Sequence, residues 1–156
     1  MRISIIAVGK KHDNKIAEAI DDYQKRASRY MTLEWRFVQI KHSASTDSNT
    51  IRKQESLKIN SVLHSEDWIC LLDEAGNTIT TPQLAQKIEG CKNSSIQNIV
   101  FVIGGAYGVD ETIIKRADFN WSLSPLVFPH QLVRLILVEQ IYRAHSILAG
   151  EKYHHQ

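Results

Sequence analysis

The sequence has few cysteines and no long hydrophobic run. Cys70 and Cys91 are its only cysteines, and a pair at this spacing supports neither a disulfide framework nor a zinc motif. No apolar run approaches the roughly 20 residues that a membrane-spanning helix needs. The apolar stretch at residues 3–8 is too short for a signal peptide and alternates as a strand does. We therefore expect a cytoplasmic protein without a membrane segment.

An excess of charge of one sign is also missing. The formal net charge is +2 over 156 residues, while 43% of the residues are hydrophobic and 23% are charged. This composition is typical of a globular domain, and it produces no strong overall field that would demand a nucleic-acid partner. Small basic clusters occur at residues 10–12 and 25–29, where solvated surface is the more ordinary explanation. The composition therefore permits an RNA partner without requiring one.

Apolar periodicity predicts strands that alternate with helices along one domain, residues 1–156. The expected strands cover residues 2–8, 33–40, 67–73, 99–103 and 121–123. The expected helices run from a cap at Asp13 or Asn14 to residue 29, and over 51–64, 81–90, 110–117 and 129–149. The polar segment 41–50 is expected to be a flexible loop. This order predicts an α/β fold with an open, mainly parallel sheet and helices on both faces.

Local signals predict where some helices begin and end. Thr81 is the expected cap of the helix over 81–90, with Pro82 as its first residue and Gly90 at its end. The helix over 129–149, which Gly150 should close, is apolar nearly all round. Such a helix is buried on more than one side, which favours a homodimer over a deeply packed monomer.

Three expected strand ends carry the candidate binding site. They are Leu72-Asp73, Gly104-Gly105 and Ser122-Leu123-Ser124, followed by the loop over 125–129. Ligands of open parallel sheets bind beyond the carboxyl ends of the strands, so neighbouring ends would form one crevice. The glycines would leave bare backbone for a ligand, although a tight turn alone would also explain them. They fit neither the dinucleotide fingerprint nor the phosphate-binding loop, whereas an adenine ring would suit the loop's backbone groups.

Several segments together resemble one family. They are residues 7–10, 101–108, 122–124, 128–130 and 134–144, and the terminal Tyr153-His154. With these residues the chain resembles the bacterial large-subunit rRNA pseudouridine N3-methyltransferases, a small branch of the SPOUT methyltransferases. The resemblance covers the whole chain and is weakest over 41–64. It implies a C-terminal trefoil knot, a homodimer, S-adenosylmethionine as methyl donor, and a pseudouridine of 23S rRNA in the assembled ribosome as substrate.

The resemblance also assigns the cofactor contacts. By position they are Leu72, Asp73, Gly104, Gly105, Ser124, Pro125, Leu126, Val127, Phe128 and Pro129. It implies no metal. A cluster of His145, His154 and His155 is a poor alternative, because adjacent histidines on a tail make a poor preformed metal site.

Methylation of an imide nitrogen requires removal of its proton and stabilisation of charge on the flanking oxygens. His154, with an ordinary pKa near ~6.5, is the candidate general base, and Tyr153 is a candidate to stack on the base. Arg143 and His130 are candidates to stabilise the oxygens or a phosphate. Alternatively, Arg143 pairs with Glu139, His130 caps the last helix, and the tail has no fixed place.

One position departs from the family pattern. The family usually has a basic residue after Tyr-His, whereas this chain has His155. Because a histidine is cationic only when protonated, we expect weaker activity at high pH than with arginine there. Two other functions stay open from the sequence: a knotted RNA-binding dimer without catalysis, and a nucleotide-binding regulatory module with a flavodoxin-like sheet.

Overall fold

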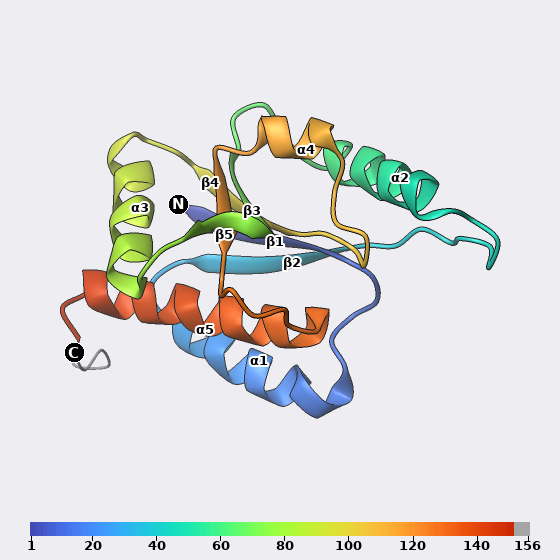
Figure 1. Ribbon diagram of the computed structural model, residues 1–156. Coiled ribbons are helices and arrows are strands. Elements are labelled where there is room, and N and C mark those ends of the chain that lie inside the picture. Colours follow the sequence, from blue (N-terminus) through green and yellow to red (C-terminus); the bar gives the residue numbers. More distant parts are fainter. Residues whose placement is uncertain (152–156) are drawn as a thin grey trace.

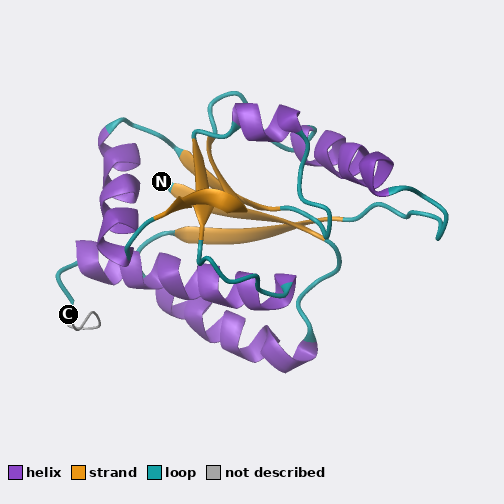
Figure 2. Ribbon diagram, viewed as in Figure 1, coloured by secondary structure: helices purple, strands orange, loops and turns teal. Residues whose placement is uncertain are grey.

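The computed structural model describes residues 1–151, which form one five-stranded sheet between two groups of helices (Figure 1). The strands are β1 (Arg2–Val8), β2 (Thr32–Val38), β3 (Trp68–Thr78), β4 (Asn98–Ile103) and β5 (Phe119–Ser122). Their order is β2-β1-β4-β3-β5, and every pair is parallel. Figure 2 shows the strands as one layer with helices on either side. The predicted parallel α/β sheet is confirmed.

The two faces of the sheet carry different helices. The first face is covered by α1 (Asn14–Ala27), α3 (Thr81–Asn93) and α5 (His130–Leu148), and the second by α2 (Ser48–Asn60) and α4 (Glu111–Arg116). The central strand β4 is buried along its whole length. Its residues Ile99, Phe101 and Ile103 belong to the core on the first face, and Val100 and Val102 belong to the core on the second. This alternation follows from the two-residue period of a strand.

The caps of α1 and α4 agree with the sequence prediction. Asp13 accepts a hydrogen bond from the backbone N–H of Lys15, and Asp110 accepts one from that of Thr112. Helix α5 begins and ends within one residue of the predicted limits, and Gly150 follows it with a φ of +70°. Short polar side chains satisfy the free N–H groups of a first turn, so these helix starts can be recognised locally.

The predicted start of α2 was wrong. Asp47 caps this helix by accepting a hydrogen bond from Thr50 N at 3.0 Å, so α2 begins inside the segment that was expected to be a loop. It ends at Asn60, four residues before the predicted end. The apolar periodicity of this helix is too weak to locate its ends, because one surface of the helix packs through polar groups.

Helix α3 also differs from the prediction. Its cap is Thr80 rather than Thr81, because Thr80 and Gln83 form a reciprocal capping box. Gly90 does not end the helix, which continues to Asn93. No atom lies within 4 Å of the position of a Gly90 Cβ. A glycine inside a helix costs about 1 kcal/mol, which the packing of α3 outweighs.

The strand β3 is longer than predicted, and β5 begins two residues earlier. The pairing of β3 with β5 is interrupted between Leu72 and Asn77. Gly76 lies in this irregular segment, where a Cβ would meet the Asn120 backbone at 2.7 Å. Asp73 accepts a hydrogen bond from Ala75 N at 2.8 Å within the same segment. The register of β3 against β5 therefore shifts directly beside the predicted site.

None of the helices in residues 1–151 has the length and apolarity needed to cross a membrane.

Candidate functional site

A cavity of about 580 Å³ lies where β4, β3 and β5 end. The pairing of β3 with β4 stops at Leu72 and Ile103, and the glycine turn and the loop after β5 continue the cavity wall. Eight of the predicted cofactor residues line it: Leu72, Asp73, Gly104, Gly105, Ser124, Leu126, Val127 and Phe128. Pro125 and Pro129 belong to the same loop but do not line the cavity. The volume suits a small organic ligand.

The serines shape the loop after β5. The Ser122 hydroxyl donates to the carbonyl oxygen of Ser124 at 3.0 Å, and the Ser124 hydroxyl accepts from Leu126 N at 3.0 Å. These bonds hold the loop in place. Leu126 and Val127 remain exposed beside the cavity. Exposed apolar side chains at the rim of a cavity are typical of a binding surface.

The glycine turn is shaped by its protein neighbours. Gly108 N donates to the carbonyl oxygen of Gly105 at 3.0 Å, and Gly108 has a φ of +70°. A Cβ on Gly104 would lie 3.1 Å from Val109 Cγ1. A Cβ on Gly105 would lie 2.9 Å from Glu55 Cδ and closer still to Glu55 Oε2. The missing side chains therefore make room for Val109 and Glu55, a different reason from the ligand approach predicted from the sequence.

A cluster of buried polar groups lies behind this turn. Glu55, on α2, is 8% exposed, and its Oε1 lies 3.6 Å from His42 Nε2. Its Oε2 has no hydrogen-bond partner among the described residues, and neither do the two ring nitrogens of His42. Burial raises the pKa of Glu55, whereas positive charge on His42 and His130 acts in the opposite direction. Glu55 is thus a buried carboxyl group behind the cavity wall, and few neighbouring groups stabilise its negative charge.

Arg52 lies one turn before Glu55 on α2 and lines the cavity itself. Its Nη2 donates to Asn49 Oδ1 at 2.8 Å, while its Nε is buried without a partner among the described residues. Residues three apart on a helix share a face, so α2 presents both groups to the glycine turn. Ser56, on the same surface, accepts a hydrogen bond from Asp110 N at 2.8 Å. Helix α2 thus holds the turn through polar contacts.

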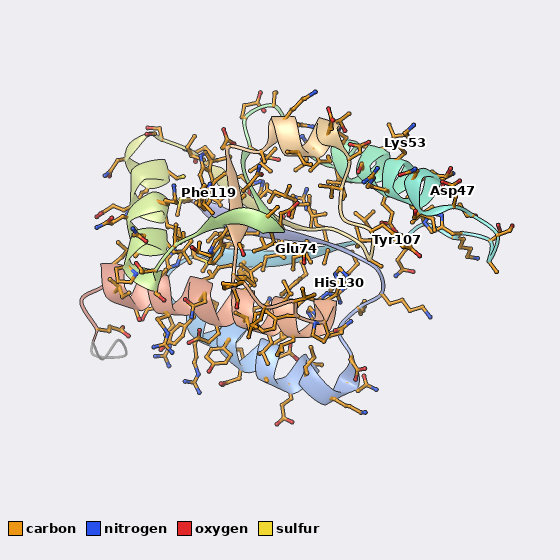
Figure 3. All side chains as sticks on the ribbon, viewed as in Figure 1. Asp47, Lys53, Glu74, Tyr107, Phe119 and His130 are labelled. Atoms are coloured by element: carbon orange, nitrogen blue, oxygen red, sulfur yellow. The ribbon has the colours of Figure 1, made fainter. Side chains whose placement is uncertain are left out.

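His130 is the first residue of α5 and lines the cavity. Figure 3 shows it on the same side of the molecule as Tyr107, which also lines the cavity. Pro129 occupies the cap position of α5, and no side chain caps the helix. His130 therefore does not cap α5, and its role at the cavity stays a prediction.

Arg143 lies far from His130 along α5. Its Nε and Nη2 donate to Glu139 Oε1 at 2.9 and 2.6 Å, which confirms the pairing within the helix. Since it follows His130 by thirteen positions on α5, about 20 Å separates the two along the axis. One chain therefore does not bring Arg143 and His130 to the same ligand atom. Tyr153, His154 and His155 lie outside the described residues.

The described residues offer no metal site. No group of three or more histidine, cysteine or acidic side chains able to hold a metal occurs within residues 1–151. His145 is buried and forms a 2.9 Å hydrogen bond between its Nδ1 and the carbonyl oxygen of Ile141. Burial lowers the pKa of His145, which favours the neutral ring of a core residue.

Several site residues were missed from the sequence. Arg52, Tyr107 and Trp121 line the cavity, and Glu55 supports it. Trp121 is buried, and its Nε1 has no partner among the described residues. The only local signal was the three-residue spacing of Arg52 and Glu55. It could not identify them as site residues, because the turn that their shared helix face points at is fifty residues away in the sequence.

The chain is similar to known methyltransferases. Residues 1–154 match the family described as "Predicted SPOUT methyltransferase". The chain is 40% identical over 158 residues to "Ribosomal RNA large subunit methyltransferase H" of Acetivibrio thermocellus, with 99% of each chain covered. It is 39% identical over 155 residues to the protein of that name from Geobacter metallireducens, again with 99% of each covered. For the Flavobacterium johnsoniae protein the identity is 40% over 157 residues, with both chains fully covered. The chain belongs to the SPOUT methyltransferase family and is a methyltransferase.

Proposed function

We propose that the protein uses S-adenosylmethionine to methylate N3 of a pseudouridine in 23S rRNA on the assembled ribosome. The observation that carries this proposal is the cavity of about 580 Å³ where the ends of β3, β4 and β5 meet. Its volume and its lining, in which apolar side chains alternate with polar ones, suit a ligand with an adenine ring and polar substituents. The family match and the names of the relatives support the class of reaction.

The residues present fit this cofactor. The loop over 124–128 offers backbone N–H and C=O groups for a purine edge, with Leu126 and Phe128 as an apolar wall. The buried Nε1 of Trp121 offers an additional donor. Leu72, Asp73, Gly104 and Gly105 would complete the contacts, and Pro125 and Pro129 would hold the loop. The bound cofactor would supply a methyl group already activated on a sulfonium sulfur.

The protein would supply proton removal and orientation. We assign His154 the role of accepting the N3 proton, and Tyr153 that of stacking on the base. His130, at the cavity, would donate a hydrogen bond to a carbonyl oxygen or a phosphate. Arg143, which lies about 20 Å along α5 from His130, would also donate a hydrogen bond to a carbonyl oxygen or a phosphate. Placement of the base against the methyl group would contribute much of the remaining rate enhancement.

The position of Arg143 supports a homodimer. A residue about 20 Å along α5 from His130 reaches a cavity more readily from a second copy of the chain. Leu132 and Leu148 are exposed near the two ends of α5. An isologous contact through this helix would cover them and bring Arg143 and the tail of one subunit to the cavity of the other.

We further propose that the 156 residues form a single SPOUT domain that acts in the cytoplasm, where ribosomes are found. The substrate would then be the ribosome rather than free rRNA. A domain of this size would use the shape of the assembled particle to find one nucleotide.

Methyl transfer to intact ribosomes and to free 23S rRNA tests the proposal, with wild type and His154→Ala compared. We expect transfer to ribosomes by wild type and a loss of more than 100-fold in the variant. Unchanged activity would remove His154 from the mechanism. Mass spectrometry of rRNA from a deletion strain should show an unmethylated pseudouridine; a methylated one would favour the RNA-binding dimer without catalysis. Calorimetry that detects no binding of S-adenosylmethionine would favour the regulatory module.

A further inference from the structure

Buried polar atoms without partners gather behind the glycine turn. Among the described residues nine such side-chain atoms occur, and four of them belong to His42, Arg52 and Glu55. Glu55 contacts the position of a Gly105 Cβ, His42 contacts Glu55, and Arg52 lines the cavity. Buried polar groups are nearly always paired, so a concentration of unpaired ones at a ligand cavity needs an explanation.

We propose that Glu55 recognises the positive charge of the methyl donor through the backbone of Gly105, and thereby makes the cavity prefer a cationic ligand to its neutral analogue. This inference rests on the proposed function, because it takes the ligand to be S-adenosylmethionine. Glu55 is not a catalytic residue in this view, since the turn separates it from the reacting atoms. It acts as an electrostatic specificity residue.

The charge balance around Glu55 supports this role. No lysine or arginine of the described residues forms an ion pair with it, and Arg52, one turn away, bonds to Asn49 instead. Its Oε1 lies 3.6 Å from Nε2 of His42, and His130 also acts on it through its charge, but both histidines are charged only when protonated. A buried carboxylate without a full partner is unfavourable in the free protein. A cation on the other side of Gly105 would relieve that, and the burial of Glu55 would strengthen the interaction by lowering the effective dielectric constant around the carboxylate.

A purely structural role does not need a carboxylate. Ser56 and Ile59 already attach α2 to the second face of the sheet, through a hydrogen bond to Asp110 N and through the core. The space behind Gly105 could be filled by an uncharged side chain of the same shape. A filling role and a charge role therefore predict different results when only the charge is removed.

The proposed reaction changes the charge of the ligand that Glu55 would attract. As the methyl group moves to N3, the sulfur–carbon bond breaks and the sulfur keeps the electron pair. The N3 proton passes to the general base of the enzyme. The sulfonium cation becomes a neutral thioether. An attraction that exists only before transfer favours binding of the donor and release of the product.

Calorimetric affinities of wild type and Glu55→Gln for three ligands test the proposal. S-adenosylmethionine carries a sulfonium, sinefungin carries an amine in its place, and S-adenosylhomocysteine is neutral there. We expect Glu55→Gln to weaken binding of the two cationic ligands by about tenfold and to leave S-adenosylhomocysteine within about twofold. Glu55→Asp keeps the charge and should keep the preference. Glu111→Gln removes a charge from a side chain on α4 that is 80% exposed, and should change none of the three affinities.

Equal weakening of all three ligands by Glu55→Gln would show a structural role and overturn the proposal. Unchanged affinities would overturn it as well. Either result, obtained while wild type binds S-adenosylmethionine, leaves the proposed function standing. If wild type does not bind S-adenosylmethionine at all, both the proposed function and the role of Glu55 fall.

Discussion

The Glu55 carboxyl group occupies the volume that a side chain at Gly105 would need. A Cβ there would lie 2.9 Å from Glu55 Cδ and 3.1 Å from Oε1. The two residues come from α2 and from the turn after β4, which pack against each other on the second face of the sheet. The sizes of the side chains at positions 55 and 105 are therefore coupled.

Gly105→Ala should displace either the turn or Glu55. We expect a loss of about 1–3 kcal/mol in the free energy of unfolding, measured in urea, and at least tenfold weaker binding of S-adenosylmethionine. Shortening Glu55 to alanine in the Gly105→Ala background should recover part of the stability, which a double-mutant cycle would measure as coupling. Additive losses would contradict the contact.

Gly90→Ala is the matched control for this substitution. No atom lies within 4 Å of the Cβ position of Gly90, which is inside α3. Here alanine should increase stability by about 0.5–1 kcal/mol, because it favours helical backbone.

Glu55→Gln should change stability in a pH-dependent way. Burial raises the pKa of Glu55 in the folded protein, opposed by charge on His42 and His130, while Arg52 faces the same turn. A carboxyl group whose pKa is raised by folding destabilises the native state when it is ionised. This destabilisation is complete above the folded pKa and absent below the unfolded pKa of about 4.3. The variant should therefore gain about 1–3 kcal/mol relative to wild type at pH 7.5 and little at pH 4, by urea unfolding. A larger gain at pH 4 would refute this prediction.

Arg134→Leu should destabilise the protein strongly. Arg134 is 2% exposed, and its guanidinium donates to the carbonyl oxygens of Lys10 at 2.9 Å and Val8 at 3.0 Å, which fastens the chain after β1 to α5. Leucine would leave these acceptors without their donor, for a loss of about 3 kcal/mol. Arg26→Ala removes an exposed pair with Asp22 and a contact of the guanidinium with the Tyr23 ring at 5.5 Å, so denaturation should show a loss of about 1 kcal/mol or less. Similar losses for the two variants would contradict the assigned role of Arg134.

His155→Arg should alter the pH profile of methyl transfer. The unperturbed pKa of a histidine side chain is about 6.5, so a histidine at this position would lose its positive charge as the pH rises, whereas an arginine would keep it. The ratio of variant to wild-type activity should therefore increase between pH 6 and pH 8.5, measured on intact ribosomes. Parallel profiles would show that a cation at this position has no part in the reaction.

Part of the site could be predicted because its signals are local. The glycine turn after the strand at 99–103 and the segment 124–129 were predicted as binding segments, and residues of both line one cavity. Arg52 and Glu55 could not be found in the same way. Their importance depends on the packing of α2 against a turn about fifty residues later, and no short-range pattern records that contact.

The sequence by itself determined the alternation of strands and helices, a cap at Asp13 or Asn14 for α1, and the cap at Asp110 for α4. These features follow from side-chain periodicity and from hydrogen bonds between residues a few positions apart. Only the tertiary structure decided the strand order that joins three strand ends into one cavity and the contact of Glu55 with Gly105. Such relationships depend on how distant segments pack, where shape, burial and charge are settled together.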